Sequence, residues 1–213
     1  MTDIKFCGLT RREDVDVAID LGAAFVGVIF AGGPRARTAE EGRSLFDGVS
    51  AARRVGVFGD QPTDVVARIA DTARLDVVQL HADPTPEFVA EAKALTGLET
   101  WAAVRVSNVL PEADMDALIS CADAILFDTR AGGTLGGTGR AFDWTLLTES
   151  LDRHRHARAR FVLAGGLTPA LVPRAIAAVR PDVVDVSSGV ELSPGVKDHG
   201  LMQAFAAAVR SAP

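Results

Sequence analysis

Two side chains that can exchange protons lie close together near the start of the chain. Lys5 and Cys7 stand two residues apart in a short apolar, β-rich run. Side chains alternate along a strand, so both point to the same face. A cation beside a thiol favours the thiolate, which makes Cys7 a candidate base or nucleophile. The competing interpretation of Cys7 is a small buried hydrophobic residue.

A second proton-transfer group ends a later apolar run. Asp128 follows Ala-Ile-Leu-Phe at residues 124–127, so it is either a cap of the next turn or an acid at the end of a strand. Two groups with opposite proton tasks suit an isomerisation. Cys7 and Asp128 are therefore the candidate catalytic pair. His154, His156 and His199 fall in helical or loop patterns and are expected to be solvated.

Glycines follow the last two apolar runs of the chain. Gly165 and Gly166 follow one run, and the sequence Ser187-Ser188-Gly189 follows the other. Backbone N–H groups without bulky neighbours can hold an anion. Enzymes built as eight-stranded barrels frequently bind phosphate in the loops after their last two strands. One Gly-Gly pair alone would be explained by a tight turn. Two such loops predict a phosphate cradle, although they do not specify a reaction.

Two further residues are candidates for holding a ligand. Arg35 follows Gly32-Gly33-Pro34, and its forked guanidinium can hold a carboxylate with two parallel hydrogen bonds; otherwise it is a surface arginine. His81 either orients a ligand group or caps its own loop. The glycine-rich stretch 132–139 is a candidate mobile lid, and it lacks the lysine and hydroxyl of a phosphate-binding P-loop.

Eight short apolar runs alternate with segments of helical periodicity, such as Val65, Val66, Ile69, Ala70 and Ala73, or Leu201, Phe205 and Val209 near the end. Alternating strands and helices predict a parallel sheet, and eight units predict a closed (β/α)₈ barrel. A doubly wound open sheet is the structural rival. The predicted strands are residues 4–7, 25–29, 53–58, 76–80, 99–104, 124–128, 161–164 and 183–186.

Composition excludes several classes of protein. The chain has 213 residues, 48% hydrophobic and 23% charged, with a net charge of −6, so disorder and a dedicated nucleic-acid binder are not expected. Two cysteines are too few for a disulfide framework. No apolar run approaches the roughly 18 residues of a membrane span, and no signal peptide is evident. We expect one domain over residues 1–213 and a cytoplasmic location.

At this level of detail the chain resembles the phosphoribosylanthranilate isomerase family of tryptophan biosynthesis. The resemblance covers nearly the whole sequence, and the order of its last two blocks is highly specific. The matching stretches are residues 5–10, 55–58, 76–81, 126–129, 136–144, 163–167, 185–191 and 193–198.

The resemblance implies a reaction and a role for each candidate residue. The reaction is the Amadori rearrangement of N-(5-phosphoribosyl)anthranilate to 1-(2-carboxyphenylamino)-1-deoxy-D-ribulose 5-phosphate. By similarity, Cys7 is the general base and Asp128 the general acid, and Arg35 holds the anthranilate carboxylate. His81 and Asp185 are pocket residues. Gly165, Gly166, Ser188 and Gly189 form the phosphate cradle, and no metal or organic cofactor is implied.

The chain departs from the family pattern at four positions: Gly33 replaces a serine, Ala82 a glycine and Phe127 an aliphatic residue, and Arg37 is an additional charge. None of these changes removes a proton-transfer group, but they leave the placement of Arg35 open.

Two other functions are weighed against this resemblance. The histidine-pathway Amadori enzyme uses aspartates after strands one and five, where this chain has Cys7 and Val104-Arg105; a dual-substrate enzyme stays open. A non-catalytic binding or regulatory subunit is expected to lack Cys7 or Asp128. The expected partner is a small phosphosugar–anthranilate substrate, without nucleic acid or membrane, and the protein is expected to be a monomer or homodimer.

Overall fold

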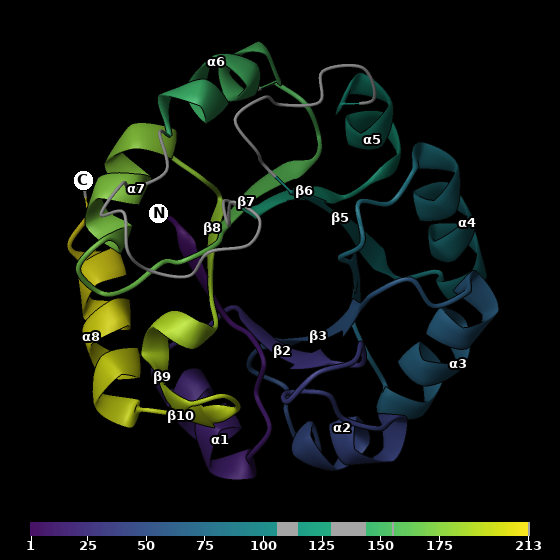
Figure 1. The fold of residues 1–213 in the computed structure, drawn as a ribbon, viewed down its shortest axis with the longest axis horizontal. Coiled ribbons are helices and arrows are strands. Elements are labelled where there is room, and N and C mark those ends of the chain that lie inside the picture. Colours follow the sequence, from purple (N-terminus) through teal and green to yellow (C-terminus); the bar gives the residue numbers. More distant parts are fainter. Residues whose placement is uncertain (106–114, 129–143, 155, 213) are drawn as a thin grey trace.

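Eight parallel strands close into a barrel in which each strand pairs with its sequence neighbours and β8 pairs with β1. The computed structural model describes residues 1–105, 115–128, 144–154 and 156–212. Figure 1 shows the barrel viewed along its axis. The strands are β1 (Asp3–Phe6), β2 (Phe25–Ile29), β3 (Arg53–Phe58), β4 (Val77–Leu80), β5 (Glu99–Arg105), β6 (Ala124–Asp128), β7 (Arg160–Ala164) and β8 (Val183–Val186). The predicted closed barrel is confirmed, and the open doubly wound sheet is excluded.

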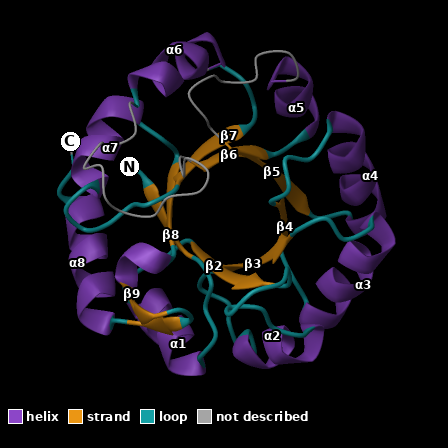
Figure 2. Cartoon of the chain, in the orientation of Figure 1, coloured by secondary structure: helices purple, strands orange, loops and turns teal. Residues whose placement is uncertain are grey.

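The helices form a ring outside the barrel (Figure 2), and α8 completes it by lying between α7 and α1 (Figure 1). They are α1 (Arg12–Asp20), α2 (Ala39–Leu45), α3 (Thr63–Ala73), α4 (Pro86–Thr96), α5 (Met115–Cys121), α6 (Thr145–His154), α7 (Val172–Val179) and α8 (His199–Arg210). Local sequence signals set their ends. Helix α4, for example, begins with the Thr85 hydroxyl capping the Phe88 N–H and ends at Gly97, whose φ is +65°. Glycine is favoured there because a side chain at positive φ is strained.

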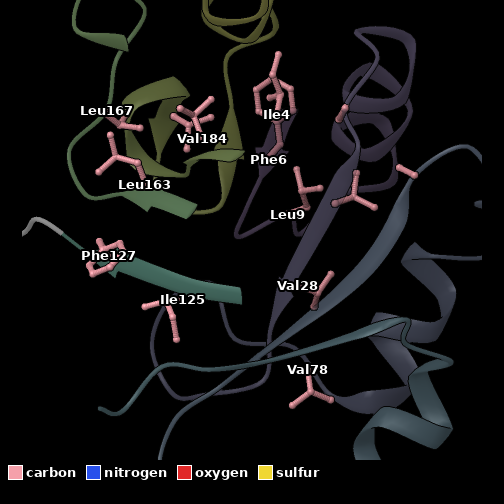
Figure 3. Packing of buried hydrophobic residues seen from close by; sticks show 14 of the residues in the cluster. Ile4, Phe6, Leu9, Val28, Val78, Ile125, Phe127, Leu163, Leu167 and Val184 are labelled. Atoms are coloured by element: carbon pink, nitrogen blue, oxygen red, sulfur yellow. The ribbon is translucent and has the colours of Figure 1, made fainter. Parts of the chain in front are cut away.

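Alternation along the strands divides the core into two layers. Outward-pointing side chains pack under the helices, and Figure 3 shows some of them, including Phe6, Phe127 and Leu163. Inward-pointing side chains such as Phe25 and Trp101 fill the barrel axis. Truncating a buried aromatic residue of this kind typically costs about 3–5 kcal/mol. The barrel is therefore a packed core, and any ligand must bind at one of its mouths.

Charged side chains occupy the N-terminal mouth. Glu99, the first residue of β5, forms ion pairs with Arg53 and Arg160, the first residues of β3 and β7. The Trp101 indole donates a 2.6 Å hydrogen bond to the same carboxylate. The guanidinium of Arg160 also lies over the rings of Phe25 and Trp101. This cluster ties alternate strands together at the mouth opposite the predicted site.

A short segment after β8 was not predicted. A 3-10 turn, η1 (Ser188–Val190), leads into an antiparallel hairpin of β9 (Glu191–Ser193) and β10 (Val196–Lys197). Two strands of this length contain too few residues for the period-two pattern to be recognised. In Figure 1 the hairpin lies at the side of the barrel, above α1 and next to α8.

The final helix buries Phe205 and Val209 as predicted, but its third predicted inner residue, Leu201, is replaced by Met202. Leu201 is 37% exposed, whereas Met202, Phe205 and Val209 are buried. His199 was expected to be solvated, but it contacts a carboxylate: its Nε2 lies 2.8 Å from Asp14 Oδ1. Likewise, His154 Nε2 lies 2.7 Å from Asp116 Oδ1.

The candidate lid at residues 132–139 lies outside the described residues. Among the helices that are described, none is long and apolar enough to cross a membrane.

Candidate active site

A cavity of about 480 Å³ opens at the C-terminal mouth of the barrel. This is the mouth at which barrel enzymes of this architecture bind their ligands. All of the residues predicted for the site line the cavity: Cys7, Arg35, His81, Asp128, Gly165, Gly166, Asp185, Ser188 and Gly189. The structure therefore brings together side chains that are up to 182 positions apart in the chain, from Cys7 to Gly189.

Cys7 lies directly after β1, above a buried ion pair. Lys5 is fully buried, and its Nζ lies 2.9 Å from Asp185 Oδ2 on β8. Gly27 on β2 makes room for this arrangement, since a Cβ there would lie 3.2 Å from Cys7 Sγ and 3.3 Å from Lys5 Cε. Lys5 and Cys7 thus share the inner face of the barrel, as predicted.

The electrostatics of Cys7 differ from the simple expectation of a thiolate. Burial raises the pKa of Cys7; Lys5 and Lys197 lower it and Asp185 raises it, and the balance lies above the ordinary value. Lys5 lowers the pKa of Cys7, as predicted, but the ion pair with Asp185 neutralises its positive charge. The resting thiol therefore keeps its proton at neutral pH.

Asp128 ends β6 and belongs to a chain of polar side chains. Its Oδ2 lies 3.3 Å from His81 Nε2, and His81 Nδ1 lies 3.0 Å from Gln79 Nε2. When the Gln79 amide donates to Nδ1 of a neutral ring, Nε2 carries the ring hydrogen and donates a hydrogen bond to Asp128 Oδ2. Gln79 lies in β4, and His81 directly follows the strand. Because the two residues are two positions apart, both side chains face the barrel axis.

Arg35 lies on the cavity wall, but one edge of its guanidinium is already bound. Its Nε and Nη2 donate to the two oxygens of Glu191, at 2.9 and 2.6 Å. Arg37 does not line the cavity, and its Nη1 donates to the Ala36 carbonyl. Arg35 is therefore the arginine from this loop that can reach a ligand.

The glycines of the predicted cradle serve different purposes. Gly165 and Gly166 have φ values of +93° and +65°, and a Cβ at Gly166 would meet nothing within 4 Å. Gly189 has a packing reason instead, because a Cβ there would collide with the Leu167 carbonyl oxygen. The two loops are thus held against each other with their backbones exposed to the cavity.

Two buried acceptors on the cavity wall have no hydrogen-bond partner among the described residues: Asp185 Oδ1 and Gln79 Oε1. A buried acceptor without a donor costs roughly 1–3 kcal/mol, so a ligand that donates hydrogen bonds at these two points would be favoured. Within the described ranges, no group of three or more His, Cys, Asp or Glu residues is placed to hold a metal ion.

Sequence reasoning missed three polar residues around the site. Gln79 lies in a block that matches the family, residues 76–81, but no local pattern indicates a role for it. Glu191 and Lys197 stand in the unpredicted hairpin, and Lys197 donates to the carbonyls of Cys7 and Ser187 at 2.6 and 3.1 Å. For Lys197, the only sequence signal was its place in a block of the family resemblance.

A closed (β/α)₈ barrel with proton-transfer groups and two glycine-rich loops at its C-terminal mouth defines the class: an enzyme acting on a small, anionic ligand. The family model for N-(5'-phosphoribosyl)anthranilate isomerase matches residues 4–208. The chain therefore belongs to the N-(5'-phosphoribosyl)anthranilate isomerase family and is an isomerase.

Individual relatives agree with the family assignment. The N-(5'-phosphoribosyl)anthranilate isomerase of Acetivibrio thermocellus is 39% identical over 100% of this chain and 97% of its own. The enzyme of Pseudomonas fluorescens is 38% identical over 97% of each chain.

Solved structures show the same fold. The phosphoribosyl anthranilate isomerase of Thermotoga maritima superposes with a TM-score of 0.85 at 34% identity over 99% of both chains. A structure of the isomerase in complex with reduced 1-(o-carboxyphenylamino)-1-deoxyribulose 5-phosphate superposes with a TM-score of 0.82 at 33% identity, again over 99% of both chains.

Proposed function

We propose that this isomerase carries out the Amadori rearrangement of N-(5'-phosphoribosyl)anthranilate by general acid–base catalysis, with Asp128 as the acid and Cys7 as the base. The product is 1-(2-carboxyphenylamino)-1-deoxy-D-ribulose 5-phosphate, and the reaction is a step of tryptophan biosynthesis. The observation that carries the proposal is that Cys7 and Asp128 line one cavity together with the two glycine-rich loops.

The proton transfers balance within one turnover. Asp128 donates a proton to the furanose ring oxygen, and the bond from C1′ to that oxygen breaks to give a protonated Schiff base. Cys7 first loses its thiol proton to solvent, and the thiolate then removes the proton from C2′, giving an enolamine. The enolamine becomes the ketone when its hydroxyl proton leaves and a proton arrives at C1′. One proton leaves the enzyme at Asp128 and one arrives at Cys7, and proton exchange with solvent returns both groups to their starting states before the next turnover.

The order of strands supports this division of labour. In the closed barrel, β7 and β8 lie between β6, which carries Asp128, and β1, which precedes Cys7. A phosphate held by the loops after β7 and β8 would place the sugar between the acid and the base. Proximity of this kind is a large part of catalysis by bound groups.

Other groups of the substrate have matching partners on the cavity wall. Asp185 Oδ1 and Gln79 Oε1, which have no hydrogen-bond partner within the described ranges, suit the hydroxyl groups of the sugar. Arg35 suits the anthranilate carboxylate, because charged donors prefer charged acceptors. Gly165, Gly166, Ser188 and Gly189 offer backbone N–H groups to the phosphate.

The remaining expectations belong to the same proposal. Residues 1–213 form one domain, the protein works in the cytoplasm as a monomer or homodimer, and its ligand is a small molecule rather than a nucleic acid.

The direct test is the Cys7→Ala variant, assayed by the loss of phosphoribosylanthranilate fluorescence. A general base contributes about 100- to 10,000-fold, so kcat should fall by at least about 100-fold. Binding of the reduced product analogue should persist, because its phosphate and carboxylate contacts remain. Cys7→Ser should rescue little, since a hydroxyl is a far weaker base near neutral pH.

Cys121→Ala is the matched control for this test. Cys121 lies at the end of α5 and is not part of the cavity wall, so its replacement should leave kcat unchanged. Turnover within a few-fold of wild type in folded Cys7→Ala protein would refute the proposed base.

A further inference from the structure

Glu191 lies behind the cavity wall and receives hydrogen bonds from three other residues. Its carboxylate is 4% exposed and is not part of the cavity lining. Besides the two bonds from Arg35, its Oε1 accepts from Lys197 Nζ at 2.9 Å and from the Gly195 N–H at 3.3 Å. Burial raises the pKa of Glu191, but the Arg35 and Lys197 donors lower it to about 2. This carboxylate is therefore ionised and fixed in place.

Lys197 connects this carboxylate to the rest of the site. Its three ammonium hydrogens are fully used by Glu191, the Cys7 carbonyl and the Ser187 carbonyl. The buried Lys197 side chain thus links three parts of the site: the backbone of Cys7, the backbone of Ser187 and the carboxylate of Glu191. The combined formal charge of Arg35, Glu191 and Lys197 is +1, so the assembly still attracts an anion.

Packing also holds Arg35 in this orientation. Its aliphatic stem passes over Gly8, where a Cβ would lie 2.8 Å from Arg35 Cδ and 2.9 Å from Ser187 Oγ. The guanidinium is planar and carries five N–H donors in a fixed fork. With Nε and one Nη2 hydrogen given to Glu191, the other Nη2 hydrogen and one Nη1 hydrogen form a second edge at the end of the fork.

We infer that Glu191 is a positioning residue that holds Arg35 so that its second edge receives the carboxylate of the substrate. The inference rests on the proposed role of Arg35 in binding that carboxylate. A guanidinium fixed in advance loses less side-chain entropy when the ligand binds. Glu191 therefore contributes to the selectivity for an aromatic amine that bears a carboxylate, without touching the ligand itself.

The test compares two ligands in binding, independently of turnover. One is the reduced product analogue, and the other is the same molecule without its carboxyl group. The dissociation constant of the ligand without the carboxyl group, divided by that of the reduced product analogue, measures how much the carboxylate contributes to binding. Glu191→Gln should reduce this ratio by about tenfold or more, the range of one charge-assisted hydrogen bond, while affinity for the ligand without carboxyl changes only a few-fold.

Arg35→Met separates failure of the inference from failure of the underlying role. If Arg35 binds the carboxylate, Arg35→Met should reduce the ratio at least as much, and adding Glu191→Gln to it should cause no further loss. A ratio unchanged in Arg35→Met would refute the proposed role of Arg35. A ratio lowered in Arg35→Met but unchanged in Glu191→Gln would refute only the positioning by Glu191.

An increased ratio in Glu191→Gln would also overturn the inference, because it would show that Glu191 competes with the ligand for Arg35. Glu191→Asp keeps the charge and should restore part of the ratio, and it provides a second variant if Glu191→Gln folds poorly. Asp76→Asn is the matched control. Asp76 holds the Arg54 fork by bonds of 2.8 Å, neither residue lines the cavity, and the ratio should not change.

Discussion

Lys5 and Asp185 form an ion pair in the barrel interior, with 2.9 Å between Nζ and Oδ2. The two residues are register partners on β1 and β8, directly below Cys7. Burial alone would lower the pKa of Lys5, but Asp185 and Cys7 raise it above its ordinary value. Lys5 is therefore permanently charged, and it is the largest influence that lowers the pKa of the Cys7 thiol.

Replacing Lys5 should move the pH dependence of the reaction. In Lys5→Met, the Cys7 thiol loses its main cationic neighbour, so its already raised pKa should rise further. The limb of kcat/KM that rises with pH should shift to higher pH, and activity near neutral pH should fall by a factor of ten for each unit by which the pKa rises. The measurement is a pH–rate profile together with the ultraviolet absorbance of the thiolate.

Cys121 serves as an internal control for that titration, because its environment does not include Lys5. The variant will also be less stable, since it leaves Asp185 buried without its partner, and only folded protein should be compared. An unshifted pH profile in folded Lys5→Met would show that Lys5 does not act through Cys7.

The proposed phosphate site allows a comparison between two glycines in the same conformation. Gly166 and Gly97 both have φ of +65°, and a Cβ at either position would meet nothing within 4 Å. Valine at either site should therefore cause a similar loss of stability, on the order of 1–2 kcal/mol, from backbone strain alone. Gly166→Val should in addition crowd the phosphate and raise KM and the dissociation constant for inorganic phosphate.

Gly97→Val should leave both constants unchanged, because Gly97 ends α4 away from the cavity. Equal KM values in the two variants, measured at matched folded fractions, would place the phosphate elsewhere.

The barrel was predictable from the sequence because its signals are local. Runs such as Ala-Ile-Leu-Phe-Asp at residues 124–128 carry their own length, β propensity and polar end. β2, β3, β6 and β8 have the predicted bounds, and the other strands differ by one residue at one or both ends. The cavity-lining residues followed from this, because the carboxyl ends of parallel strands meet at one mouth of a barrel.

The partners of those residues could not be predicted in the same way. Arg35 and Glu191 are 156 positions apart, and nothing local to either residue indicates the other. The hairpin that carries Glu191 and Lys197 is too short for periodicity. On α8, Leu201 and Met202 are adjacent apolar residues, and only packing against the barrel decides which of them is buried.

Acid should weaken the fold partly through Glu191. The pKa of Glu191 is about 2 in the folded protein, against an ordinary value of 4.5. The ionised Glu191 therefore stabilises the fold fully at pH values above 4.5. That contribution should be lost as pH falls through the folded pKa. Glu191→Gln should be less stable than wild type at neutral pH, and the two stabilities, measured by urea denaturation, should converge as pH falls from about 4.5 towards 2. Parallel curves would mean that Glu191 is not the titrating group.

The proposed acid is tested most directly by Asp128→Asn, which keeps the shape of the side chain and removes its transferable proton. General acid catalysis contributes about 100- to 10,000-fold, so kcat should fall by at least about 100-fold. The reduced product analogue should still bind, because its phosphate and carboxylate partners are unchanged. Asp123→Asn is the control, since Asp123 precedes the same strand at the opposite mouth and pairs with Lys93 at 2.8 Å.

A kcat for folded Asp128→Asn within a few-fold of wild type would reassign the acid. Asp185 is the other carboxyl group from the predicted set on the cavity wall, but its Oδ2 is held by the charged Lys5. We therefore expect Asp185→Asn to affect binding of the sugar hydroxyls and the pH dependence of Cys7 more than the opening of the ring. Comparing the two variants at several pH values separates these effects, because only loss of the acid should lower kcat by the same factor at every pH at which Cys7 is ionised.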